Sequence, residues 1–125
     1  MKIYLAARYS RRQEMVGYAN RLRELGCEIT AQWVDGSEEG QPLTENAIMD
    51  FEDVMRADLV VSFTEPYGSK NKGGGRHTEL GMAYALGIDN WIIGEREQIF
   101  HHLPEIRQFD SFEDVVQELS LAKVA

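Results

Sequence analysis

The sequence has a single cysteine, Cys27, and no run of about 18 apolar residues that could cross a membrane. One cysteine cannot form an internal disulfide, and with Ile29 near it on an expected strand we interpret it as a small buried side chain. The N-terminus lacks the pattern of a signal peptide, and residues 1–7 are instead typical of a strand. We therefore expect a soluble protein that works in the reducing cytoplasm.

Positive charge is also scarce, with 13 lysine and arginine residues against 21 acidic ones and a formal net charge of -8. An acidic surface repels phosphodiester polymers and anionic membranes, so we expect neither a nucleic-acid polymer nor a membrane as a partner. No internal repeat, low-complexity run or linker interrupts the 125 residues, 43% of which are hydrophobic. We predict a single domain spanning residues 1–125.

Short apolar runs alternate with amphipathic segments along the chain. We expect strands at residues 2–6, 27–32, 59–63 and 91–93, with a weaker fifth at 106–109. We expect helices at about 12–25, from Thr44 to about 55 with Ile48, Phe51 and Met55 on one stripe, at 76–86, and after a capping box of Asp110 and Glu113. This alternation predicts a three-layer α/β fold of the flavodoxin or Rossmann-like kind, with a parallel sheet of about five strands and helices on both faces.

The polar loops of such a fold gather at one rim of the sheet. Ligands of open parallel sheets bind beyond the carboxyl ends of the strands, where the strand order reverses. The loops after the first three expected strands span residues 8–12, 33–42 and 64–75, so the polar and glycine-rich segments all belong to this rim. The third loop ends in the triple glycine 73–75, which permits positive φ angles and close approach of the backbone to a ligand.

Glu79 follows the triple glycine about one turn into the expected helix. A helix N-terminus has unpaired N–H groups and a partial positive charge, which lower the pKa of a nearby carboxyl group. Glu79 is therefore a candidate nucleophile that stays ionised, although it could equally be a carboxylate that only stabilises the helix. Asp50, in the preceding expected helix, is a second candidate acid of the site, although it could instead be a solvated residue beside Asp53.

Basic residues concentrate at the same rim. Arg8, Arg11 and Arg12 follow the first strand closely, and guanidinium groups are well suited to clamp a phosphate. The alternative is that Arg11 and Arg12 begin an exposed helix and point to solvent. Trp33, at the end of the second expected strand, either caps the core or stacks on a nucleobase.

A metal site is not expected. His101 and His102 are adjacent, and neighbouring histidines on a loop rarely point at one ion. No further cysteine or histidine has a spacing that would complete a ligand set. We expect no metal and no cofactor.

Three parts of the sequence resemble the nucleoside 2-deoxyribosyltransferase-like superfamily. They are the first strand with Tyr4 and its small-residue turn, Asp50 eight residues before Asp58 and the apolar strand, and the glycine-rich segment that carries Glu79 and continues to Gly87. The superfamily includes deoxyribosyltransferases and nucleoside 5′-monophosphate N-glycosidases. The resemblance covers nearly the whole chain and is sharpest in the helix of Glu79.

The resemblance implies an enzyme that cleaves or transfers the base of a nucleoside or nucleoside 5′-monophosphate through a covalent glycosyl-enzyme intermediate. It gives Glu79 the attack on the anomeric carbon, Asp50 a contact with the sugar or nucleophile, and Tyr4 a place in the pocket wall. Together with the polar rim, the expected substrate-binding residues are Tyr4, Arg8, Ser10, Arg11, Arg12, Trp33, Ser69, Gly74, Gly75, Arg76 and His77. It also implies a homodimer or larger assembly, in which Phe100, His101, His102 or the Trp33 loop reaches a neighbouring subunit.

Some points stay open at this level. The aspartate with which the best-studied transferases handle the base corresponds to Gly73, and the leaving base could take its proton from Asp50, His77 or a water. Three alternatives to the enzyme above are a non-catalytic nucleotide-binding module, an NAD or cyclic-nucleotide glycohydrolase similar to the Toll/interleukin-1 receptor-like group, and a phosphoribohydrolase with a similar glycine–glutamate motif.

Overall fold

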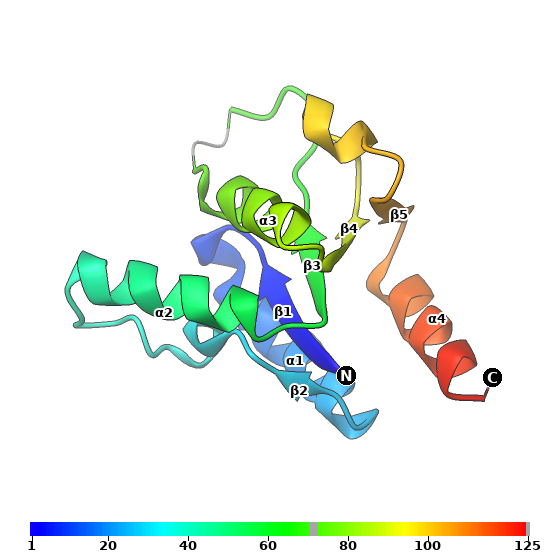
Figure 1. Ribbon diagram of the computed structural model, residues 1–125, viewed down its shortest axis with the longest axis horizontal. Coiled ribbons are helices and arrows are strands. Elements are labelled where there is room, and N and C mark those ends of the chain that lie inside the picture. The colour runs from blue at the N-terminus through cyan, green and yellow to red at the C-terminus, as the bar shows by residue number, and fades with distance from the viewer. Residues whose placement is uncertain (71–72, 125) are drawn as a thin grey trace.

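A computed structural model describes residues 1–70 and 73–124 as a five-stranded, wholly parallel sheet with helices on both faces (Figure 1). The strand order is β2-β1-β3-β4-β5. The strands are β1 (Lys2–Ala6), β2 (Glu28–Ile29), β3 (Leu59–Phe63), β4 (Asp89–Ile93) and β5 (Arg107–Phe109). The helices are α1 (Arg12–Glu24), α2 (Leu43–Met55), α3 (Gly75–Ala85) and α4 (Phe112–Val124), with the 3-10 turns η1 (Tyr9–Arg11), η2 (Gln32–Asp35) and η3 (Ile99–His102). The predicted three-layer α/β class is confirmed.

The helices divide into two layers. On one face α1 packs against α4, where the Tyr18 and Phe112 rings stack at 4.3 Å and Arg21 pairs with Glu113 at 2.7 Å. On the other face α2 lies beside α3, and α3 covers the central strands (Figure 1). The chain leaves β1 toward β2 but leaves β3 toward β4, so the order reverses between β1 and β3. The carboxyl ends of these two strands therefore define the expected binding edge.

The second strand is shorter than predicted. A strand over residues 27–32 was expected, but only Glu28–Ile29 form one and the chain turns into η2 at Gln32. The reason is a tertiary contact, because the Asp53 carboxylate accepts the Gln32 backbone N–H at 3.0 Å and its side-chain amide at 2.9 Å. The backbone donor that would extend the strand is thus used by a helix, and Gly36, at φ +83°, ends the turn.

Helix α2 presents the opposite face from the one that its apolar spacing suggests. Ile48, Phe51 and Met55 are 53%, 41% and 44% exposed, whereas Asp53 is 1% exposed. Asp53 can be buried because Gln32 and Arg56 satisfy its oxygens. The helix also starts before the predicted cap, since Leu43 is already helical after Pro42 and Thr44 lies inside the first turn.

The last helix is capped one residue later than predicted. The hydroxyl of Ser111, not the carboxylate of Asp110, accepts the backbone N–H of Asp114 at 3.2 Å. Its inward face buries Phe112, Val115 and Leu119. No helix in the described part of the chain is long and apolar enough to cross a membrane.

Candidate active site

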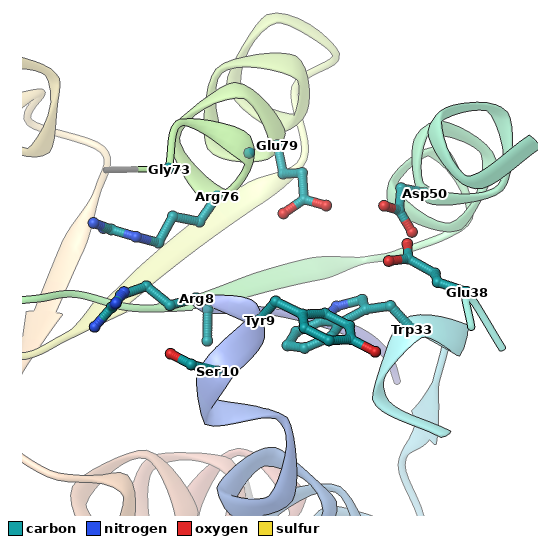
Figure 2. Close-up of a pocket in the computed structure, with 11 residues that line it drawn as sticks. Arg8, Tyr9, Ser10, Trp33, Glu38, Asp50, Gly73, Arg76 and Glu79 are labelled. Atoms are coloured by element: carbon teal, nitrogen blue, oxygen red, sulfur yellow. The ribbon is translucent and has the colours of Figure 1, made fainter. Parts of the chain in front are cut away.

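A pocket of about 380 Å³ opens at the carboxyl ends of β1 and β3, as the reversal of strand order predicts (Figure 2). Its volume is in the usual range for small-molecule sites. Four segments form the wall: the turn after β1, the loop after β2, helix α2, and the start of α3. The lining residues are Ala7, Arg8, Tyr9, Ser10, Trp33, Glu38, Asp50, Gly73, Gly75, Arg76 and Glu79.

Glu79 points into the middle of this pocket from the second turn of α3 (Figure 2). The hydroxyl of fully buried Tyr4 donates a hydrogen bond to Glu79 Oε2. Burial raises the pKa of Glu79 to about 7; the negative charge of Glu38 adds to the increase, while the Tyr4 hydrogen bond opposes it. A side chain with this pKa supplies both the ionised and the neutral carboxyl form near neutral pH.

The lowered pKa expected for Glu79 is therefore wrong in direction. Glu79 is the fifth residue of α3, and the influence of a helix N-terminus is largely confined to the first turn. Partial burial of the carboxyl group outweighs it, because low-dielectric surroundings disfavour the charged form.

A second carboxyl cluster occupies one end of the pocket. The side chains of Glu38 and Asp50 face each other there (Figure 2). Burial raises the pKa of Asp50 to about 8, helped by the facing Glu38 carboxyl group, to which a protonated Asp50 can donate, and by the charges of Glu38, Glu79 and Asp53. Asp50 is thus not the solvated residue that the sequence left open as an alternative. Glu38 was not anticipated, although the 33–42 loop was.

The opposite end of the pocket is basic. Arg8 and Arg76 lie there, with Glu79 between them and the acidic pair (Figure 2). Arg8 is one-third exposed and lies 3.5 Å from a carboxylate oxygen of Glu65. Arg76 is 6% exposed and forms a double ion pair with Glu97, while its Nε has no partner among the described residues.

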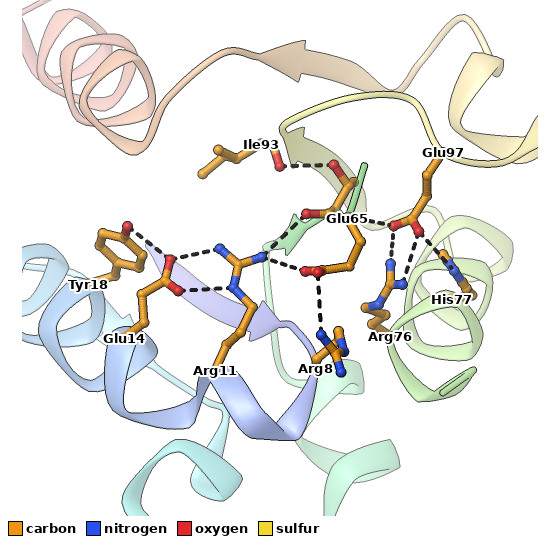
Figure 3. A network of polar contacts seen from close by, with 10 residues as sticks. Arg8, Arg11, Glu14, Tyr18, Glu65, Arg76, His77, Ile93 and Glu97 are labelled. Carbon is orange, nitrogen blue, oxygen red and sulfur yellow. Dashed lines mark hydrogen bonds and ion pairs between the residues drawn. The ribbon is translucent and has the colours of Figure 1, made fainter. Parts of the chain in front are cut away.

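Arg11 and Arg12 are partly buried and do not line the pocket. Arg11 donates to Glu14 at 2.7 Å, to Glu65 at 2.9 Å and to the Thr64 carbonyl at 3.3 Å, which ties α1 to the loop after β3 (Figure 3). Arg12 donates to the Val34 carbonyl at 2.9 Å. We expected these arginines either to clamp a phosphate or to point to solvent at the start of a helix. Neither expectation describes the contacts that they make. The two side chains fix the loops of the rim.

Several other predicted residues lie outside the lining of this pocket. His77 turns to the Gln98 side chain at 3.1 Å and lines a separate groove on α3. Ser69 is exposed in a turn, where its N–H donates to the Pro66 carbonyl at 2.9 Å. Gly74 is the N-cap of α3. Gly73 lines the pocket, and its φ of +150° agrees with the positive φ angles expected for the triple glycine.

Trp33 caps the core, one of the two alternatives that its sequence position left open, and also lines the pocket. Its ring is 5% exposed and its indole N–H donates to the Leu5 carbonyl at 2.9 Å, so it caps the core. The ring also lines the pocket, beside Tyr9 at a centroid distance of 6.2 Å. Burial of Trp33 and of His101, which is 1% exposed, keeps both side chains from reaching a neighbouring subunit, whereas Phe100 is 60% exposed.

Acidic side chains dominate the chemistry of the pocket. Within residues 1–70 and 73–124, no three histidine, cysteine or acidic side chains are grouped so that they could hold a metal ion. The carboxyl groups of Glu38, Asp50 and Glu79 can carry protons, and an ionised carboxylate among them can act as a nucleophile.

Solved structures match the chain over most of its length, and their fold is that of the nucleoside 2-deoxyribosyltransferase-like proteins. A CMP N-glycosidase from Clostridium botulinum is 18% identical with a TM-score of 0.68, and the match covers 97% of this chain and 99% of that one. A 2-deoxyribosyltransferase from Leishmania mexicana is also 18% identical with a TM-score of 0.68, over 94% and 95%. A third match, to a 2-deoxyribosyltransferase from Bacillus psychrosaccharolyticus, has 20% identity and a TM-score of 0.67, over 92% and 90%.

These likenesses confirm the fold that the sequence resemblance implies. No protein-family model and no curated protein matches the sequence. At identities of 18–20% the shared fold does not carry an activity with it, so function has to be argued from the site.

Proposed function

We propose that this protein is an enzyme that cleaves the N-glycosidic bond of a nucleoside or nucleoside 5′-monophosphate, with Glu79 as the nucleophile. The observation that carries the proposal is the position of Glu79 in mid-pocket, hydrogen-bonded by Tyr4, between a basic end and an acidic end. The reactions named for the neighbouring structures, N-glycoside cleavage and deoxyribosyl transfer, favour this chemistry over others that a carboxylate can perform.

The two ends of the pocket suggest how a nucleotide binds. A 5′-phosphate suits the end with Arg8, Ser10 and the start of α3, because a guanidinium group and a helix N-terminus both favour an anion. The base then lies at the other end, over the rings of Tyr9 and Trp33, and the anomeric carbon lies between the ends, at Glu79.

The reaction follows from the charge that develops on the sugar. As the bond to the base breaks, its electron pair leaves with the base and positive charge grows at the anomeric carbon. The ionised Glu79 carboxylate stabilises this charge and forms an ester with the carbon. Water then releases the sugar, or a second base displaces Glu79 to give a new nucleoside. Two displacements on one carbon retain its configuration.

A substrate panel tests the proposal. The protein is incubated with ribo- and deoxyribonucleosides and their 5′-monophosphates, with and without a free base, and products are identified by mass. We expect base release from at least one compound; a new nucleoside would indicate transfer. Thermal stabilisation by a nucleotide without any product would contradict catalysis and support a binding module, and nicotinamide release from NAD alone would support a different glycohydrolase.

Arg8 supplies a prediction about the phosphate. Arg8→Ala should raise KM for a 5′-monophosphate about tenfold while changing KM for the matching nucleoside by less than about twofold, because only the phosphate loses a charge-assisted contact. Steady-state kinetics on the two substrates measure the ratio. Arg23→Ala, an exposed arginine of α1, is the control. Equal losses on both substrates would place the phosphate elsewhere.

A second copy of the chain is the proposed cover for the apolar stripe of α2, formed by Ile48, Phe51 and Met55. Large apolar side chains grouped on one helix face are typical of an interface. We expect a homodimer or larger assembly in sedimentation velocity, and a shift to monomer for Phe51→Lys. A wild-type monomer at micromolar concentration would contradict this.

A cytoplasmic location stays a prediction.

A further inference from the structure

The acidic end of the pocket has an arrangement that two ionised carboxylates would not tolerate. Glu38 Oε1 and Asp50 Oδ1 are both shielded from solvent, and no N–H or O–H group among the described residues donates to either atom. The two carboxyl groups nevertheless face each other across this end of the pocket (Figure 2). A hydrogen bond between two carboxyl groups needs a proton on one of them, because carboxylates only accept.

A contact within the chain fixes the Glu38 loop against the helix that carries Asp50. Asn46 lies one turn before Asp50 on α2, and its side-chain amide donates to the Glu38 carbonyl at 3.2 Å. One face of α2 therefore fixes the Glu38 loop through Asn46 and also carries Asp50, which faces the Glu38 side chain. The pair is therefore built into the junction of the loop with α2, and does not depend on a chance approach of two surface side chains.

The charged surroundings favour keeping the proton. Glu79 on α3 and Asp53 on α2 add negative charge near Asp50, and the Tyr4 hydroxyl on β1 is committed to Glu79. The pocket cations, Arg8 and Arg76, lie at the far end in contact with Glu65 and Glu97. Since the pKa of Asp50 is about 8 and that of Glu79 about 7, Glu79 ionises while the pair still holds its proton.

His77 does not compete for this role. Its ring contacts the Gln98 amide and lines the groove on the other side of α3, not this pocket. Burial and the neighbouring Arg76 charge also lower the pKa of His77, although Glu97 acts in the opposite direction. Fewer of the rings therefore carry a proton to donate near neutral pH.

We propose that Glu38 and Asp50 share one proton and that Asp50 delivers it to the leaving base, with Glu38 as the positioning residue that keeps Asp50 protonated. This inference rests on the proposed function. In the first step the bond from the anomeric carbon to the base nitrogen breaks and its electron pair goes to the base. The base accepts the shared proton, and a Glu79 oxygen forms the new bond to carbon.

The second step restores the enzyme. Water attacks the anomeric carbon, the ester bond returns its electron pair to Glu79, and the proton lost by the water goes to the Glu38–Asp50 pair. One water is consumed and each carboxyl group regains its starting form. When a second base replaces water, that base returns the proton instead.

The kinetic test compares Glu38→Gln with the wild type across pH 5–10, on the best substrate of the panel and on a 4-nitrophenyl glycoside of the same sugar. Glu52→Gln, an exposed acid on α2, is the control. Nitrophenolate leaves without a proton, so it bypasses an acid. We expect kcat on the natural substrate to fall about tenfold or more, and its alkaline limb near pH 8 to move down by about one unit or more. On the glycoside the rate should change less than about threefold.

Equal losses on both substrates with unmoved pH limbs would overturn the inference, because they would indicate a merely structural Glu38. A second measurement does not depend on turnover. Carboxyl titration by NMR should find a group with a pKa near 8 in the wild type and none above about 7 in Glu38→Gln. Glu38 and Asp50 both titrating near 4 in the wild type would also overturn the inference. A wild type with no turnover on the whole panel would count against the proposed function, and the titration would still decide the shared proton.

Discussion

Glu79→Gln should abolish base release, lowering kcat/KM by on the order of 10³-fold or more. Glutamine keeps the size of the side chain and still accepts the hydrogen bond from Tyr4, but it has neither the charge to stabilise an oxocarbenium-like sugar nor the oxygen to form an ester. Base release followed by chromatography on the best substrate of the panel measures the loss. Glu52→Gln, a solvent-exposed exchange of the same kind, should retain full activity.

The same variant tests the covalent intermediate. Rapid acid quenching of the wild-type enzyme with substrate should leave a fraction of the protein heavier by one sugar unit, and peptide mapping should find the added mass on the segment that contains Glu79. Glu79→Gln should show no such species. Turnover that survives in the glutamine variant would move the nucleophile to another carboxylate of the pocket, with Glu38 the first to examine.

The pH dependence expected for the wild type follows from two raised pKa values. Activity should rise as Glu79 ionises around pH 7 and fall as the acidic pair loses its proton around pH 8. Because these values lie close together, only part of the enzyme has both groups in the required form at any pH. The profile should therefore be a narrow bell between them.

Local patterns in the sequence were enough to predict the fold. The run Leu59–Phe63, apolar except for Ser62, became the fully buried β3, and the helix expected at about 12–25 became α1. Errors arose where a tertiary contact overrides local pattern. Asp53 binds Gln32 and shortens β2, and its burial turns the apolar stripe of α2 outward. No local spacing reveals either event.

The candidate site was only partly predictable for the same reason. The sequence indicated Glu79, Asp50 and Arg8, and the structure brings their side chains into one pocket. Which arginines face the pocket depends on acceptors distant in the chain, such as Glu65 for Arg11. Glu38 has no periodic or motif signal, since an acid in a polar loop looks like any solvated residue until its partner on α2 is known.

Asp50→Asn should change activity and stability in opposite directions. Without an acid to protonate the leaving base, kcat on the natural substrate should fall on the order of 10²-fold. The pKa of Asp50 is about 8 in the folded protein, well above the ordinary value of 3.8. The folded state therefore holds a proton that the unfolded state releases, and the free energy of unfolding falls as the pH rises from the ordinary value to about 8. Asparagine has no charge to bury and removes this loss.

Thermal unfolding at pH 5 and pH 9 measures the second effect. The Tm of Asp50→Asn should exceed that of the wild type by roughly 3 °C at pH 9, a modest gain because Asp50 is only half-buried and solvent screens part of its charge. The difference should shrink or reverse at pH 5, where the folded wild type already holds the proton. A variant that loses both activity and stability at each pH would make Asp50 a structural residue. If Asp50 is retained for catalysis at a cost to the fold, removing its charge has to raise the stability of the protein.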